Sequence, residues 1–148
     1  MQQFNNKSLI ILIFLINLIK INYKKKSITI KFSSNVSSFQ IIIQETLFNQ
    51  ILQNFVQNAI KFTPNGKTIK IKLKKIDDKV ILNVIDEGIG IDENIDVFAP
   101  FKKVGKENGV GLGLYLAKIA SDALNAKISI KNREDGKNGA IAKLELNL

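Results

Sequence analysis

Residues 50–62 read QILQNFVQNAIKF, and at about 3.6 residues per turn they separate into a wide apolar face and a narrow polar face. The polar face carries Asn54, Asn58 and Lys61 at i, i+4 and i+7, so two carboxamides and one ammonium group line up along one side of a helix. A carboxamide oxygen can ligate Mg²⁺, and a lysine can contact phosphate oxygens. Taken alone, the pattern also suits an ordinary solvated helix face.

The composition indicates one globular domain. The sequence has 148 residues, of which 45% are hydrophobic and 24% charged. It contains no cysteine and no histidine, which excludes a thiol nucleophile, a Cys or His metal ligand and a phosphoacceptor histidine within these residues. The formal net charge of +9 suits a polyanionic ligand such as a nucleotide. Because most lysines are scattered, we do not predict a nucleic-acid interface.

The N-terminal part divides into two segments. Residues 1–7 are predicted to be a disordered start. Residues 8–19, SLIILIFLINLI, are the most hydrophobic part but are too few to span a bilayer as a helix. We expect a helix that packs in the domain or against a partner, while a membrane anchor or a signal-peptide core stays open.

Alternation of apolar and polar residues predicts a sheet, and longer amphipathic patterns predict two further helices. Strands are expected at 27–32, 39–43, 67–75, 79–85, 127–131 and 140–148, and helices at 45–62 and 112–124. The apolar side of the second helix is expected to consist of Leu112, Leu116, Ile119, Ala120, Ala123 and Leu124. The predicted fold class is α+β, a two-layer sandwich over residues 8–148 whose mixed, mostly antiparallel sheet has helices on one face.

Two glycine-containing motifs suggest ligand binding, one through a carboxylate and one through backbone N–H groups. Asp86 ends a predicted strand and is followed by Gly88 and Gly90, so its carboxylate can accept a hydrogen bond from an exocyclic amine beside a tight turn. A plain Asp-Gly turn is the alternative. The second motif, GVGLGL at residues 109–114, begins a helix whose free N–H groups can bind an anion. It is neither a P-loop nor a dinucleotide fingerprint, since its context differs from both.

Together these motifs resemble the ATP-binding catalytic domain of sensor histidine kinases, in the superfamily of gyrase, mismatch-repair and chaperone ATPases with the Bergerat-type ATP-binding fold. Residues 54–63 resemble the asparagine box of that family, and residues 86–91 its first glycine box. Residues 98–101, FAPF, resemble its phenylalanine box, and residues 109–114 its second glycine box. Gln44 departs from the family, which usually has an aspartate before the helix, so the helix cap is in doubt.

The resemblance implies roles for individual residues. Asn54, Asn58 and Lys61 form the expected catalytic set, with Asn58 as the Mg²⁺ ligand and Asn54 where hydrolysing relatives carry a glutamate. The expected ATP contacts are Asn54, Asn58, Lys61, Phe62, Asp86, Gly88, Gly90, Ile91, Lys103, Gly109, Val110, Gly111, Leu112, Gly113 and Leu114. Residues 92–108 are the expected lid, with Lys102 and Lys106 as further phosphate contacts.

The implied function is a kinase module that binds ATP and Mg²⁺ and donates the γ-phosphoryl group to a histidine outside this chain, in a two-component phosphorelay. The implied partners are a histidine-bearing dimerisation domain or a response-regulator receiver, without nucleic acid, on the cytoplasmic face. Two alternatives share the nucleotide site, a pseudokinase or nucleotide sensor and a kinase with a serine or other acceptor. A third is a membrane-anchored interaction fragment built around residues 8–19.

Overall fold

The computed structural model describes residues 2–3, 26–37, 41–101 and 111–148. The predicted hydrophobic helix at 8–19 and much of the predicted lid lie outside these residues. In the described ranges, no helix is long and apolar enough to cross a membrane. At the predicted disordered start, β1 (Gln2–Gln3) pairs antiparallel with β3 (Ile42–Ile43).

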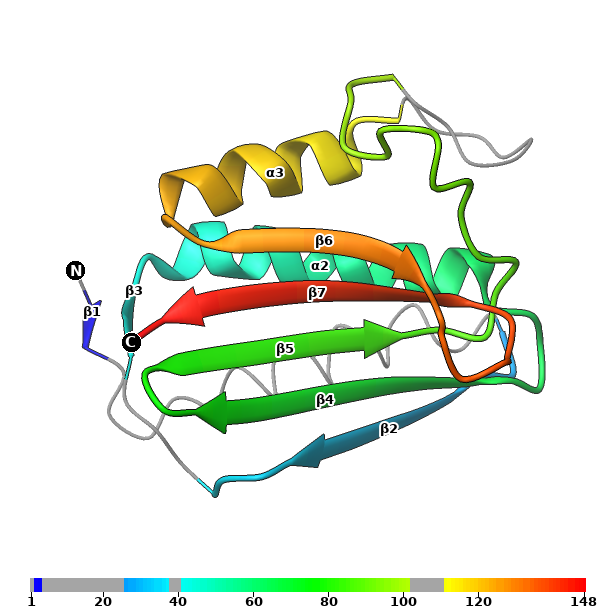
Figure 1. Cartoon of the computed structure of the whole chain (residues 1–148), viewed down its shortest axis with the longest axis horizontal. Coiled ribbons are helices and arrows are strands. Elements are labelled where there is room, and N and C mark those ends of the chain that lie inside the picture. The colour runs from blue at the N-terminus through cyan, green and yellow to red at the C-terminus, as the bar shows by residue number, and fades with distance from the viewer. Residues whose placement is uncertain (1, 4–25, 38–40, 102–110) are drawn as a thin grey trace.

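One five-stranded sheet forms the framework, in the order β2-β4-β5-β7-β6 (Figure 1). The bounds are β2 Thr29–Ser34, β4 Thr68–Ile76, β5 Lys79–Ile85, β6 Lys127–Asn132 and β7 Ala140–Asn147. Only the β2–β4 pair is parallel among these neighbours, and the other three pairs are antiparallel. The prediction of a mixed, mostly antiparallel sheet is therefore confirmed.

The strand bounds follow the pairing more closely than the sequence pattern. We expected a strand at 27–32, but β2 begins at Thr29, which pairs with the first residue of β4, Thr68. The strand expected at 39–43 is shorter, because only Ile42 and Ile43 pair with β1. The other four strands agree with the predicted ranges to within one residue at each end. An edge strand extends only where its neighbour offers backbone partners, which a single-strand pattern does not encode.

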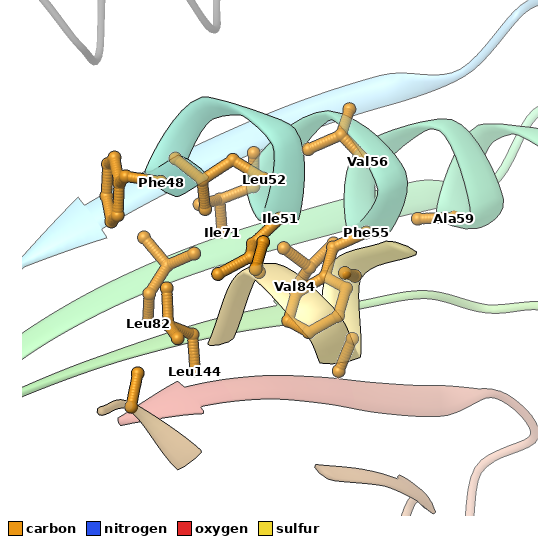
Figure 2. Close-up of a cluster of buried hydrophobic side chains, with 14 of the residues drawn as sticks. Phe48, Ile51, Leu52, Phe55, Val56, Ala59, Ile71, Leu82, Val84 and Leu144 are labelled. Carbon is orange, nitrogen blue, oxygen red and sulfur yellow. The ribbon is translucent and has the colours of Figure 1, made fainter. Parts of the chain in front are cut away.

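The helix α2 (Glu45–Phe62) lies across one face of the sheet and has the predicted bounds. Its wide apolar face is buried, and it consists of seven residues, Phe48, Ile51, Leu52, Phe55, Val56, Ala59 and Ile60. Figure 2 shows several of them facing Val84, Leu82 and Leu144 of the sheet. Gln44 makes no side-chain capping hydrogen bond, as the missing aspartate led us to expect. Burial of this continuous apolar face is what holds α2 on the sheet.

The helix α3 (Gly113–Ala123) packs against α2, but not with the predicted face. Its buried residues are Ala117, Ala120 and Ser121, whereas Leu116 is 40% and Ile119 is 48% exposed. Small side chains let two helices approach closely, so the contact selects small residues rather than large apolar ones. The predicted apolar face of α3 was therefore wrong at Leu116, Ile119 and Ala123, which are exposed, whereas Ala120 is buried and Leu124 packs partly buried against the core as predicted.

Candidate functional site

A small cavity of about 40 Å³ lies between α2, the sheet and the start of α3. It is lined in part by Asn58 and Phe62 of α2, by Asp86 and Ile91 beyond β5, and by Leu114 of α3. Gly90 and Val97 also line it. Three of the motifs found in the sequence therefore meet around one space. Most of the lining side chains are apolar, so a carboxylate and a carboxamide are the polar groups that can orient a ligand there.

Asp86 directly follows β5 and is held by the loop after it and by the first residue of β7. Its Oδ1 accepts hydrogen bonds from the Gly88 amide and the Ala140 amide, both at 2.9 Å. Burial raises the pKa of the Asp86 carboxyl above its ordinary value, although these two N–H groups and the Arg133 charge oppose the rise. Since both bonds go to Oδ1, the second oxygen is left to accept a hydrogen bond from a ligand.

The two glycines after Asp86 are required by close backbone approach. A Cβ on Gly88 would lie 2.7 Å from the carbonyl oxygen of Phe62, at the end of α2. Gly90 has a φ of +79°, and a Cβ there would lie 2.5 Å from Asn132 Oδ1. Substituted residues would collide with backbone in the first case and adopt a left-handed conformation in the second. The loop 86–91 can therefore run tightly between α2 and β6 only with glycine at both positions.

Asn54 lies where α2 meets Gly113 of the second glycine motif. Its Nδ2 donates to the Gln50 carbonyl at 2.8 Å, which leaves Oδ1 facing α3. A Cβ on Gly113 would lie only 2.6 Å from that oxygen. Leu112, at the N-cap of α3, provides no side-chain cap. The first N–H groups of α3 therefore lie close to the polar face of α2, where an anion can accept from them.

The C-terminal end of α2 carries two of the predicted ATP contacts, Lys61 and Phe62. The Lys61 ammonium lies 5.3 Å from the centroid of the Phe62 ring. Lys26 Nζ donates to the carbonyl oxygens of Ile60, Lys61 and Thr63 at 2.9, 2.8 and 3.2 Å. These are carbonyls that a helix end otherwise leaves without a partner. Sequence analysis missed Lys26, because this lysine lies more than 30 residues before the carbonyls that it bonds and so gives no local signal.

The loop that follows Gly90 is organised by two short acidic turns. Asp92 Oδ1 accepts from the Asn94 amide and Asp96 Oδ1 accepts from the Phe98 amide, both at 3.0 Å. Val97 is buried against the cavity, whereas Phe101 is 71% exposed. The Phe101 amide donates to the Gly111 carbonyl at 3.1 Å, which joins a residue within the predicted lid to the second glycine motif.

Five predicted contacts lie outside the described residues, namely Lys102, Lys103, Lys106, Gly109 and Val110. The structure brings Asn54, Asn58, Lys61, Phe62, Asp86, Gly88, Gly90, Ile91, Leu112, Gly113 and Leu114 to one region, and Gly111 is hydrogen-bonded to Phe101. Sequence analysis missed two residues beside the site. Asn132 contacts the backbone of Ile91, and Arg133 Nη1 donates to the Asp86 carbonyl at 3.1 Å.

The comparisons with solved structures agree with the fold. The nucleotide-free catalytic domain of histidine kinase ThkA superposes with a TM-score of 0.85 and 29% identity, covering 99% of this chain and 94% of that one. Full-length ShkA in complex with AMPPNP gives a TM-score of 0.83 and 25% identity, covering 98% of this chain and 30% of that one.

Curated relatives are sensor kinases. The sensor protein KdpD of Clostridium acetobutylicum is 35% identical over 128 residues, which is 82% of this chain and 14% of that protein. The histidine protein kinase SaeS of Staphylococcus aureus is 31% identical over 125 residues, 78% of this chain and 35% of that protein. The chain thus spans 14% to 35% of the length of these two relatives. Residues 43–148 match the family described as histidine kinase-, DNA gyrase B- and HSP90-like ATPases, and the chain belongs to that family.

Proposed function

We propose that this chain binds ATP with Mg²⁺ and donates the γ-phosphoryl group to a histidine outside the sequence. The observation that carries the proposal is the cavity that unites Asp86, Asn58, Phe62 and the start of α3. A half-buried acceptor at one end and a helix N-terminus near the other suit a ligand with an amine-bearing base and a phosphate chain.

The base end is the apolar part of the cavity. Asp86 is ionised at neutral pH in this proposal and accepts a hydrogen bond from the exocyclic amine of adenine. Phe62 and Ile91 lie on the cavity wall and offer apolar surface to the base. Guanine presents a carbonyl oxygen in place of that amine, so it would face the carboxylate with an acceptor. The site should therefore favour ATP over GTP.

The phosphate end is the polar face of α2 together with the start of α3. Asn58 would hold Mg²⁺ through its side-chain oxygen, and Lys61 would contact the phosphates. In the described ranges there is no group of three acidic side chains suited to a metal ion. A single carboxamide nevertheless fits Mg²⁺, because that ion keeps water and takes phosphate oxygens as ligands. Leu112, Gly113 and Leu114 would offer backbone contacts.

The lid contributions are part of the same proposal. Lys103 of the lid would contact the phosphates, with Lys102 and Lys106 as further cationic contacts. Beside the lid, Gly109, Val110 and Gly111 of the second glycine motif would hold the triphosphate. Closing such a segment over the ligand excludes water from the reacting phosphate. The hydrogen bond between Phe101 and Gly111 would tie the lid to the second glycine motif.

In this proposal the chain positions the reactants and neutralises charge, which is most of what phosphoryl transfer requires. An imidazole nitrogen of the partner attacks the γ-phosphorus, the bond to the β-bridging oxygen breaks, and ADP leaves with that oxygen. Asn54 stands near the phosphate end where a carboxylate would activate water, and a carboxamide is a poor general base. The site therefore favours transfer over hydrolysis.

The relatives support the choice of partner. ThkA has been solved in complex with the response regulator TrrA, and that kinase chain matches at 28% identity with a TM-score of 0.80. The match covers 99% of this chain but 41% of that one. We propose a histidine-bearing dimerisation domain as the direct phosphoryl acceptor and a response-regulator receiver as the next, with the domain on the cytoplasmic face.

A transfer assay tests the proposal. The chain is mixed with γ-labelled ATP, Mg²⁺ and a purified histidine-bearing dimerisation domain from a relative. We expect acid-labile label on that domain, and its loss with Asn58→Ala or without Mg²⁺. Saturable ATP binding without transfer to any acceptor would contradict the kinase and favour a nucleotide sensor. Label on a serine would favour the other-acceptor branch.

A further inference from the structure

The end of β6 is hydrogen-bonded to the loop that forms one wall of the cavity. Asn132, the last residue of β6, makes two hydrogen bonds to the backbone of Ile91. Its Oδ1 accepts from the Ile91 amide at 2.8 Å, and its Nδ2 donates to the Ile91 carbonyl at 2.9 Å. A side-chain carboxamide here acts as a backbone partner would in a strand pair, although the two residues are 41 positions apart.

Two neighbouring contacts fix the position of this loop along β6. The Asn132 amide donates to Glu93 Oε1 at 3.0 Å, so the residues on the far side of Ile91 are held as well. On the near side, Gly90 has no side chain and leaves room for the Asn132 carboxamide, which a Cβ would approach to 2.5 Å. The loop therefore cannot shift along β6 without breaking these bonds or colliding with the carboxamide.

The next residue holds the other end of the same loop. Arg133 Nη1 donates to the Asp86 carbonyl at 3.1 Å, and its side chain is 5% exposed. Asp135 fixes this guanidinium through two hydrogen bonds, from Nε at 3.1 Å and from Nη2 at 2.5 Å. Consecutive residues of the β6–β7 hairpin thus hold both ends of the loop 86–91.

We propose that Asn132 is a positioning residue for base recognition, which sets the separation between the Asp86 carboxylate and the opposite wall at Gly90 and Ile91. Asn132 does not line the cavity itself and acts through Ile91. The inference rests on the proposed nucleotide function and extends it from the residues that touch the ligand to the hairpin that holds them. Loss of the carboxamide should loosen the wall and weaken the selection of adenine over guanine.

The test compares three variants. Asn132→Ala removes both bonds to Ile91, and Asn132→Asp keeps the acceptor but loses the donor. Asn147→Ala is the matched control, since Asn147 is an exposed asparagine at the far end of β7, where it pairs with Lys79. Dissociation constants for non-hydrolysable ATP and GTP analogues are measured by calorimetry with Mg²⁺. Urea midpoints show that each variant is folded at the measuring temperature.

We expect Asn132→Ala to weaken ATP binding about tenfold, as two lost hydrogen bonds suggest. GTP binding should change much less, so the ATP-to-GTP preference falls by nearly the same factor. Asn132→Asp should weaken ATP binding at least as much as Asn132→Ala, because its second oxygen faces the Ile91 carbonyl oxygen in place of the donor. Asn147→Ala should stay within about twofold of wild type. A merely structural role would lower the urea midpoint and leave the preference between the two nucleotides unchanged.

Two failures are distinguishable. Wild type that binds neither nucleotide would overturn the proposed function itself, and the inference with it. Wild type that binds ATP selectively, together with an unchanged ATP-to-GTP preference in a folded Asn132→Ala, would overturn the inference alone. If Asn132→Ala does not fold, Asn132→Asp decides by the same preference, because it retains one of the two bonds.

Discussion

At the scale of single residues, the site holds a carboxylate that folding alone does not favour. Asp86 lies where burial raises its pKa, and the amides of Gly88 and Ala140 only partly offset that cost. A residue that destabilises the free protein is expected where a ligand completes its hydrogen bonding. In the proposed complex, the adenine amine supplies that missing donor.

Asp86→Asn should therefore stabilise the ligand-free protein at pH 7. A raised pKa means that the folded protein binds the proton more tightly than the unfolded chain, so the ionised carboxylate lowers stability above that pKa. The cost disappears as the pH falls below the ordinary value of 3.8. Urea unfolding of both proteins between pH 3 and pH 7 measures the difference. Equal stability at pH 7, or a less stable variant, would contradict this account of Asp86.

Gly139 offers a second test at the residue scale. Its φ is +129°, and a Cβ there would overlap the carbonyl oxygen of Asp86. Gly136, in the same hairpin, has a φ of +76° but nothing within 4 Å of its Cβ position. We expect Gly136→Ala to cost about 1 kcal/mol of unfolding free energy from backbone strain alone. Gly139→Ala should cost clearly more, and equal costs would exclude the overlap as a cause.

At the scale of elements, α2 is the part of the chain that its own sequence specifies most fully. All seven apolar positions are buried and both bounds agree with the pattern. The face of α3 could not be predicted, because the residues that pack are set by its partner helix and not by its own hydrophobicity. Leu116 and Ile119 are large apolar side chains of α3, yet they are exposed while Ala117 is buried.

The C-terminal end of α2 depends on a residue from outside the helix. Lys26→Met removes the ammonium that bonds three carbonyl oxygens there and keeps most of the aliphatic chain. We expect a loss of about 1 kcal/mol in unfolding free energy, since a cation at a helix C-terminus contributes on that order. Lys31→Met, at an exposed position of β2, is the control and should change stability by less than about 0.5 kcal/mol. A Lys26→Met variant as stable as the control would show that the cap contributes nothing.

At the scale of the whole molecule, the sheet places motifs that are far apart in the sequence around one cavity. The motifs themselves could be found by pattern, since spaced glycines and a polar helix face are local features. Asn132, Arg133 and Lys26 could not, because each acts on backbone more than 30 residues away. The strand order β5-β7-β6 places Asn132 and Arg133 beside the loop that follows β5.

The central claim is that Asp86 recognises the base of a bound nucleotide, and its most direct test is calorimetric. A non-hydrolysable ATP analogue is titrated with Mg²⁺ into wild type and into Asp86→Asn. We predict saturable binding to wild type that the substitution weakens by about 1.5–3 kcal/mol, the worth of a hydrogen bond to a charged group. No saturable binding to folded wild type, or equal affinity in the two proteins, would contradict the account.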